Sequence, residues 1–134
     1  MRKMYVGIDV SKDCFKVAVK DEGNNQVMPV KVYGHDRAGL EAFGRAMCAL
    51  KEQTGCGALY GMEATGIYHL SVYQYLVDAE EDVKVFNGLE LKRFKGRIRK
   101  TKTDDIDALA IAEALILVTE PTYHPSSEPL LIRL

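Results

Sequence analysis

The chain has 134 residues, of which 47% are hydrophobic and 28% are charged, so it suits one compact domain and is not a wholly disordered protein. No apolar run approaches the roughly 20 residues that a membrane-spanning helix needs, so we expect neither a membrane span nor a signal peptide. The three cysteines show no CxxC spacing. That pattern favours reduced, structural thiols in a cytoplasmic protein.

Charge is spread unevenly along the chain, although the formal net charge is only -1, from 18 bases and 19 acids. The segment KRFKGRIRKTK, residues 92–102, carries seven of the bases and no acid. The rest of the chain keeps 11 bases against 19 acids, a net charge of -8. An acidic body with one basic segment predicts a polyanionic partner that meets the chain at this segment.

The first third of the chain has the alternating pattern of strands. Residues 4–10, 14–20 and 26–33 are predicted to form three strands in antiparallel order, and DEGNN is the turn before the third. Pro29 lacks a backbone donor, so the third strand is expected at a sheet edge or at a bulge.

Beyond these strands the period changes. From Asp36 to about Gln53, apolar residues recur at three- and four-residue steps, which predicts a helix that Gly55 ends. The next elements are a strand over 56–63, a helix over 67 to about 79, a strand over 82–86 and a short helix over 89–95. Thr103 is expected to cap a last helix that runs to about Val118. This order predicts an α/β protein with a mixed sheet covered by helices.

Two carboxylates stand at the ends of apolar strands. Asp9 ends the first strand and Glu63 the fourth, and each has a glycine two residues earlier, Gly7 or Gly61, on the same face. A buried unpaired carboxylate is costly, so these acids need an explanation. The glycines are expected to leave room beside each carboxylate for a bulky substrate.

The stretch KTKTDDIDALA adds a second pair of acids. Asp104 and Asp107 are three residues apart, so on a helix they would share one face and could join Asp9 and Glu63 at the sheet edge. Four gathered carboxylates need a compensating cation, and all-oxygen ligation favours Mg²⁺ or Mn²⁺ over zinc. Two such ions about 4 Å apart would stabilise a phosphodiester displacement. Each acid alone also fits a structural role, as a turn residue or in the first turn of a helix.

Three motifs, YVGIDVSKD, MEATG and KTDDIDA, resemble those of the N-terminal domain of the DEDD transposases. That family includes the Piv-type invertases and the bridge-RNA-guided insertion-sequence recombinases. The resemblance implies a ribonuclease-H-like (RuvC-like) fold, with three antiparallel strands, then parallel strands, and helices on both faces of the sheet. It also implies that Asp9, Glu63, Asp104 and Asp107 are the catalytic and metal-binding acids, with Mg²⁺ or Mn²⁺ as the cofactor.

The resemblance further implies DNA as the partner, together with a structured guide RNA in some members and a homo-oligomer of the full-length protein. The residues expected to bind nucleic acid are Lys12, Lys92, Arg93, Lys95, Arg97, Arg99, Lys100 and Lys102. We expect a catalytic domain over 1–118 and a proline-rich linker over 119–134. In the family a coiled coil and a second domain with a nucleophilic serine follow. The domain alone is therefore expected to be incompetent for DNA cleavage and strand transfer.

Three other functions fit parts of the pattern. The chain could be a Holliday-junction resolvase-like nuclease that acts by itself, or a truncated domain that binds nucleic acid without catalysis. Actin-like sugar kinases also open on a GID strand, but they need a second such domain and glycine-rich phosphate loops, which are missing from this chain.

Several other residues allow more than one interpretation. The helix IDALAIAEALILV is apolar almost all round, so it is either deeply buried or part of a dimer face. Phe94, inside the basic segment, is a candidate for stacking on bases. The histidines His35, His69 and His124 are isolated, which favours surface or hydrogen-bonded structural roles over metal ligation.

Overall fold

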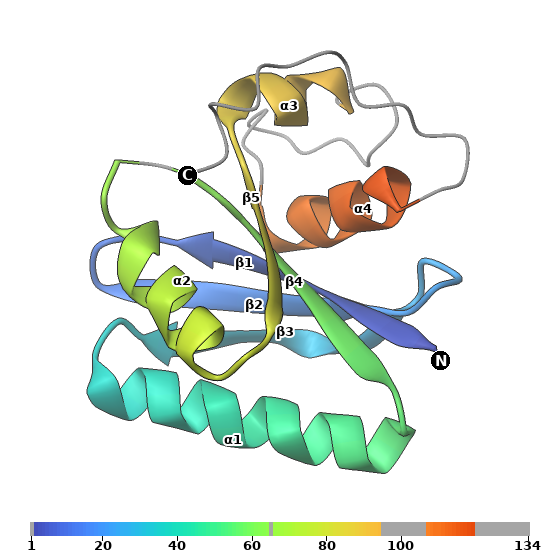
Figure 1. The fold of residues 1–134 in the computed structure, drawn as a ribbon, viewed down its shortest axis with the longest axis horizontal. Coiled ribbons are helices and arrows are strands. Elements are labelled where there is room, and N and C mark those ends of the chain that lie inside the picture. Colours follow the sequence, from blue (N-terminus) through green and yellow to red (C-terminus); the bar gives the residue numbers. More distant parts are fainter. Residues whose placement is uncertain (1, 65, 95–106, 120–134) are drawn as a thin grey trace.

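The computed structural model describes residues 2–64, 66–94 and 107–119 as a sheet with helices on both faces (Figure 1). The strands are β1 (Lys3–Val10), β2 (Cys14–Lys20), β3 (Gln26–Gly34), β4 (Gly57–Glu63) and β5 (Asp82–Phe86). The helices are α1 (Arg37–Thr54), α2 (His69–Asp78), α3 (Gly88–Arg93) and α4 (Ala108–Val118). The element order expected from the sequence is confirmed.

The five strands form one mixed sheet in the order β3-β2-β1-β4-β5. The first three pair antiparallel, whereas β4 pairs parallel with both β1 and β5. The strand that contains Pro29 lies at the sheet edge, and its pairing with β2 shifts register between Val17 and Lys20. The proline is tolerated because an edge strand needs fewer ladder hydrogen bonds.

Alternation along the strands divides the core into two layers. Residues such as Val6, Ile8 and Tyr60 pack against Phe43 of α1 and Leu76 of α2 on one face. On the other face, Tyr5 and Phe86 pack with residues of α3 and α4, among them Leu91, Ile111 and Leu115. In Figure 1, α1 lies below the sheet and α3 and α4 lie above it.

Local caps fix where the helices begin and end. The Asp36 carboxylate accepts from the Gly39 amide at 2.7 Å and starts α1, and Gly55, with φ of 67°, ends it. Asn87 and Glu90 form a reciprocal capping box at the start of α3. These caps satisfy backbone groups that a helix end otherwise leaves unpaired.

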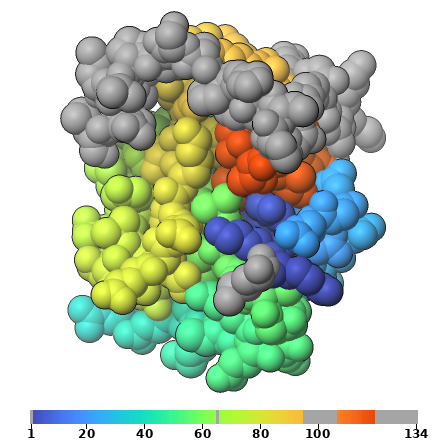
Figure 2. Space-filling model, turned by 45° about the vertical axis from the view of Figure 1, so that its right-hand side comes forward, coloured from blue at the N-terminus to red at the C-terminus, as the bar shows by residue number. Residues whose placement is uncertain are grey.

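The apolar helix α4 is buried, which decides between the two interpretations of its sequence. Residues 110–115 are all buried, and they include Glu113, whose carboxylate bonds the Lys20 ammonium of β2 at 2.7 Å. Figure 2 shows α4 in red directly above the dark blue of β1. In the described part of the chain, no helix is long and apolar enough to cross a membrane.

Candidate functional site

Asp9 and Glu63 end neighbouring parallel strands at the same edge of the sheet. Gly7 pairs with Gly61 and Ile8 with Met62, so the two acids are the next residues along β1 and β4. Both are partly buried. Because the carboxyl ends of parallel strands meet at one edge, the sheet brings these two predicted site residues together.

The two carboxylates interact electrostatically. Burial raises the pKa of the Glu63 carboxyl above its ordinary value, and the negative charge of Asp9 raises it further. A carboxylate oxygen of Glu63 also reaches toward the start of α3, because a Cβ built on Gly88 would lie 3.6 Å from it. The site thus combines partial desolvation with like-charge repulsion, and a cation would relieve the repulsion.

The room beside the carboxylates is taken by α4, so the expectation that the glycines admit a substrate was wrong. A Cβ built on Gly7 would overlap the Ala108 carbonyl oxygen and lie 2.5 Å from the Ala112 nitrogen. A Cβ on Gly61 would lie 2.8 Å from side-chain carbons of Leu115. The paired glycines therefore let one helix pack closely across both strands.

The start of α4 differs from the expectation. The helix begins at Ala108, and the Asp107 carboxylate accepts from the Ala110 amide at 2.9 Å as its N-cap. Thr103 is therefore not the cap of α4, and Asp107 immediately precedes the helix. Asp caps helices at least as well as Thr, and Ala108, the first residue of α4, lies over Gly7. Asp104 and Thr103 lie outside the described residues.

The start of α4 lies at the sheet edge that carries Asp9 and Glu63. Asp107 comes one residue before the contact of Ala108 with Gly7, and Asp9 lies two residues beyond Gly7 in β1. Within residues 2–64, 66–94 and 107–119, no group of three histidine, cysteine or acidic side chains is arranged to hold a metal ion. The Asp9–Glu63 pair nevertheless has the all-oxygen chemistry that suits a hard divalent cation.

The predicted nucleic-acid-binding residues fall in several places. Lys12 is exposed in the turn that follows β1. Lys92 and Arg93 end α3, and Phe94 is buried with its ring edge-to-face against Phe86 at 6.4 Å, so it is not a free surface for bases. The remaining predicted bases, Lys95, Arg97, Arg99, Lys100 and Lys102, lie outside the described residues.

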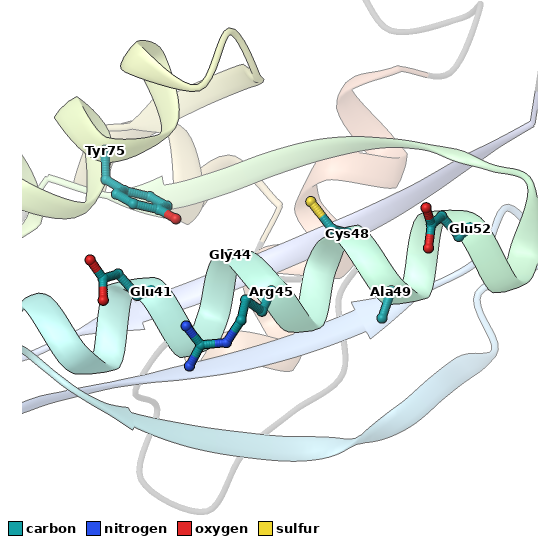
Figure 3. A pocket seen from close by; sticks show the side chains of 7 residues that line it. All are labelled: Glu41, Gly44, Arg45, Cys48, Ala49, Glu52 and Tyr75. Carbon is teal, nitrogen blue, oxygen red and sulfur yellow. The ribbon is translucent and has the colours of Figure 1, made fainter.

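A shallow hollow lies between α1 and α2, and neither Asp9 nor Glu63 lines it (Figure 3). Tyr75 of α2 lies over Gly44 of α1, where any Cβ would overlap its hydroxyl. The lining residues are Glu41, Gly44, Arg45, Cys48, Ala49, Glu52 and Tyr75. None of the predicted site residues contributes to this hollow, so we do not assign the site to it.

The sequence around His35 does not mark it as a site residue. In the structure it connects the turn after β1 with α2, two segments that follow the carboxylates. Its partners are 24 and 36 residues away in the sequence, and no local pattern carries that information. His69 differs from the expectation of a surface or hydrogen-bonded histidine, since it is buried and its Nδ1 has no hydrogen-bond partner among the residues that the structure describes.

Solved structures of RuvC have the same fold. Thermus thermophilus RuvC in complex with a Holliday junction substrate superposes with a TM-score of 0.59 at 11% identity, over 87% of this chain and 94% of that chain. A second structure of Thermus thermophilus RuvC gives a TM-score of 0.56 at 12% identity, over 88% and 95% of the two chains. The protein is therefore an α/β domain of the RuvC-like, ribonuclease-H-like class.

A family model of DEDD transposases of the IS110 type, described as a transposase, matches residues 6–133. No curated protein matches this chain. The chain belongs to the DEDD transposase family and is a transposase-type domain. This assignment excludes the sugar-kinase alternative.

Proposed function

We propose that this domain binds DNA and holds Mg²⁺ or Mn²⁺ for phosphodiester cleavage and strand transfer in a transposase or site-specific recombinase. The observation that carries the proposal is the Asp9–Glu63 pair. Both carboxylates are partly buried on neighbouring strands, and burial, followed by the negative charge of Asp9, raises the pKa of the Glu63 carboxyl. A divalent cation turns that repulsion into attraction.

Asp9 and Glu63 would hold the cation first, with Asp107 and Asp104 as further ligands. Asp107 accepts from the Ala110 amide through one carboxylate oxygen, and this contact fixes its side chain at the start of α4. When bound, the metal supplies Lewis acidity at the phosphate and a water of lowered pKa. The chain's own acids orient it, and the packing of α4 against the glycines of β1 and β4 keeps their strands in register.

The basic segment 92–102 would hold the DNA backbone beside the acids. It begins in α3, whose first residue Gly88 is close to the Glu63 carboxylate. Lys12, which is exposed in the turn after β1, would add a second contact to the DNA backbone. Phosphate contacts of this kind set affinity and position without reading sequence. A structured guide RNA would meet the same segment, and assembly of several copies of the protein would bring two such sites to the DNA.

Cation binding can be tested with the chain as it is. We expect isothermal titration with Mn²⁺ to detect binding by the wild-type chain and a loss of at least tenfold in affinity for Asp9→Asn. Glu22→Gln, an exposed acid in the β2–β3 turn, is the matched control and should bind as wild type does. Equal affinity for wild type and Asp9→Asn would contradict the proposed site.

A nuclease that resolves branched DNA by itself is the second candidate. It is favoured by the fold likeness to RuvC, whose structure is a complex with a Holliday junction substrate. Incubation of this chain with four-way junctions and with linear duplexes, in Mg²⁺, separates the two candidates. Cleavage confined to the junction would favour the resolvase, whereas no cleavage together with Mn²⁺ and DNA binding would favour a transposase domain that needs further protein.

A further inference from the structure

His35 contacts two segments that follow the candidate carboxylates. Its backbone amide donates to the Asp13 carbonyl oxygen at 3.0 Å, and its Nδ1 is 2.7 Å from the Ser11 carbonyl oxygen. Its Nε2 is hydrogen-bonded to the Ser71 hydroxyl of α2. One side chain therefore joins the turn after β1 to the helix that follows β4.

The partners of the ring determine its tautomer. A carbonyl oxygen only accepts, so Nδ1 of His35 carries the proton that is donated to Ser11. In the neutral ring Nε2 is then the acceptor, and the Ser71 hydroxyl donates to it. The buried Phe15 ring meets the imidazole edge-to-face at 6.3 Å, which holds the plane of the imidazole ring.

The strand pairing between β1 and β4 does not extend to the two acids, so a contact beyond the strand ends can influence their separation. Pairing between β1 and β4 runs as far as Ile8 and Met62, one residue short of the two acids. Asp9 instead pairs with Lys16 of β2, and Glu63 pairs with Phe86 of β5, so each acid pairs with the strand on its far side from the other acid. The His35 bridge lies beyond the strand ends and ties together the segments that leave them, which in Figure 1 gather near the start of α2.

We propose that His35 is a positioning residue that, through Ser11 and Ser71, fixes the separation of the Asp9 and Glu63 carboxylates. The inference rests on the proposed function, in which these two acids hold a divalent cation. Groups that orient metal ligands from outside typically change affinity by about 10- to 100-fold when they are removed.

The experiment compares His35→Ala and Ser71→Ala with two controls. Ser71→Thr keeps the hydroxyl, and Gln74→Ala removes a different exposed hydrogen bond of α2, the one to Asp78 at 2.8 Å. We expect His35→Ala and Ser71→Ala each to weaken Mn²⁺ binding about tenfold or more, and the double variant to lose little beyond His35→Ala. Ser71→Thr and Gln74→Ala should stay within about threefold of wild type.

A second readout needs no metal. The Ser11 amide donates to the Cys14 carbonyl at 2.9 Å, inside the turn that His35 holds. In metal-free buffer its hydrogen exchange should become about tenfold faster in His35→Ala and in Ser71→Ala, and stay unchanged in Gln74→Ala.

The outcomes separate the inference from the proposed function. Mn²⁺ affinity in His35→Ala within twofold of wild type would overturn the inference, and so would an equal loss in Gln74→Ala. If the wild-type chain binds no Mn²⁺, the proposed metal site fails, and unchanged exchange of the Ser11 amide would then overturn the inference as well. If His35→Ala does not fold, Ser71→Ala decides, because its side chain is at the surface.

Discussion

Glu63 is an acidic residue that is partly buried and lies beside a second acid, Asp9. It is the last residue of β4, which buries Tyr60 and Met62 in the core, and Asp9 lies at the same end of the neighbouring strand β1. An acid whose pKa is raised in the folded state destabilises the fold when it is ionised. Keeping the carboxylate there is unfavourable for stability alone, which is the expected sign of a functional position.

Replacing Glu63 with Gln should therefore stabilise the metal-free protein at neutral pH. The wild type loses stability as the pH rises from the ordinary carboxyl value of 4.5 through the raised folded pKa, whereas the amide does not titrate. In chelator at pH 7 we expect Glu63→Gln to have the larger free energy of unfolding, with a difference that shrinks toward pH 4. Urea unfolding across this pH range measures it.

Saturating Mn²⁺ should reverse the order of the two proteins. A cation at one hundred times its dissociation constant stabilises the wild type by about 2.7 kcal/mol, and the variant has lost a ligand. The control is Glu22→Gln, in an exposed turn, which should follow wild type under both conditions. A Glu63→Gln protein less stable than wild type in chelator would contradict this account of the acid.

The packing of α4 on the sheet depends on two glycines in register. Gly7 and Gly61 lie side by side on β1 and β4, and α4 crosses above them with the Ala108 backbone against one and the Leu115 side chain against the other. Close packing leaves no room for a methyl group at Gly7, because the atoms that it would meet belong to backbone.

Adding a methyl group at these positions should give graded losses of stability. We expect Gly7→Ala to lower the free energy of unfolding by about 3 kcal/mol, since α4 must move, and Gly61→Ala by about 1 kcal/mol, since the Leu115 side chain can rotate. Gly23→Ala in the β2–β3 turn is the control, expected within about 0.5 kcal/mol of wild type. Urea unfolding of the three variants tests the series, and equal effects at Gly7 and Gly23 would contradict the described position of α4.

The same helix shows what the sequence could predict and what it could not. Apolar runs bounded by turn residues were sufficient to predict β1, β2 and β5, because each of these strands contributes apolar side chains to the core. Residue spacing also placed Gly7 and Asp9 on one face, but it contains no information about what covers that face. The expected cap was Thr103, whereas α4 is capped by Asp107, because local sequence preference does not fix the residue at which a helix begins.

The whole molecule separates its charges between an acidic body and one basic segment. The acids of the candidate site lie where β1 and β4 end, and the basic segment begins at Lys92 within α3, whose first residue, Gly88, is close to Glu63. The formal net charge of -1 therefore conceals a strong local contrast. Such a contrast favours a polyanion that approaches from one direction.

The salt dependence of DNA binding should reveal this contrast. If Arg97 and Arg99 each contact a phosphate, replacing both with Ala should reduce the slope of log K against log salt by about 1.8 for duplex DNA. Lys31→Ala with Arg37→Ala removes the same charge from exposed positions on β3 and α1 and should leave the slope nearly unchanged. Fluorescence anisotropy over a salt series measures it, and equal slopes for both double variants would contradict a specific role for the basic segment.

Anomalous diffraction from crystals of this chain soaked in Mn²⁺ would locate the bound cation. We expect a manganese peak bound by the Asp9 and Glu63 carboxylates, and no peak there in crystals of Asp9→Asn. Asp9 would then be partly buried because it is a metal ligand. Wild-type crystals without a peak at these two acids, at a Mn²⁺ concentration that saturates binding in solution, would contradict the claim that this pair is the metal site.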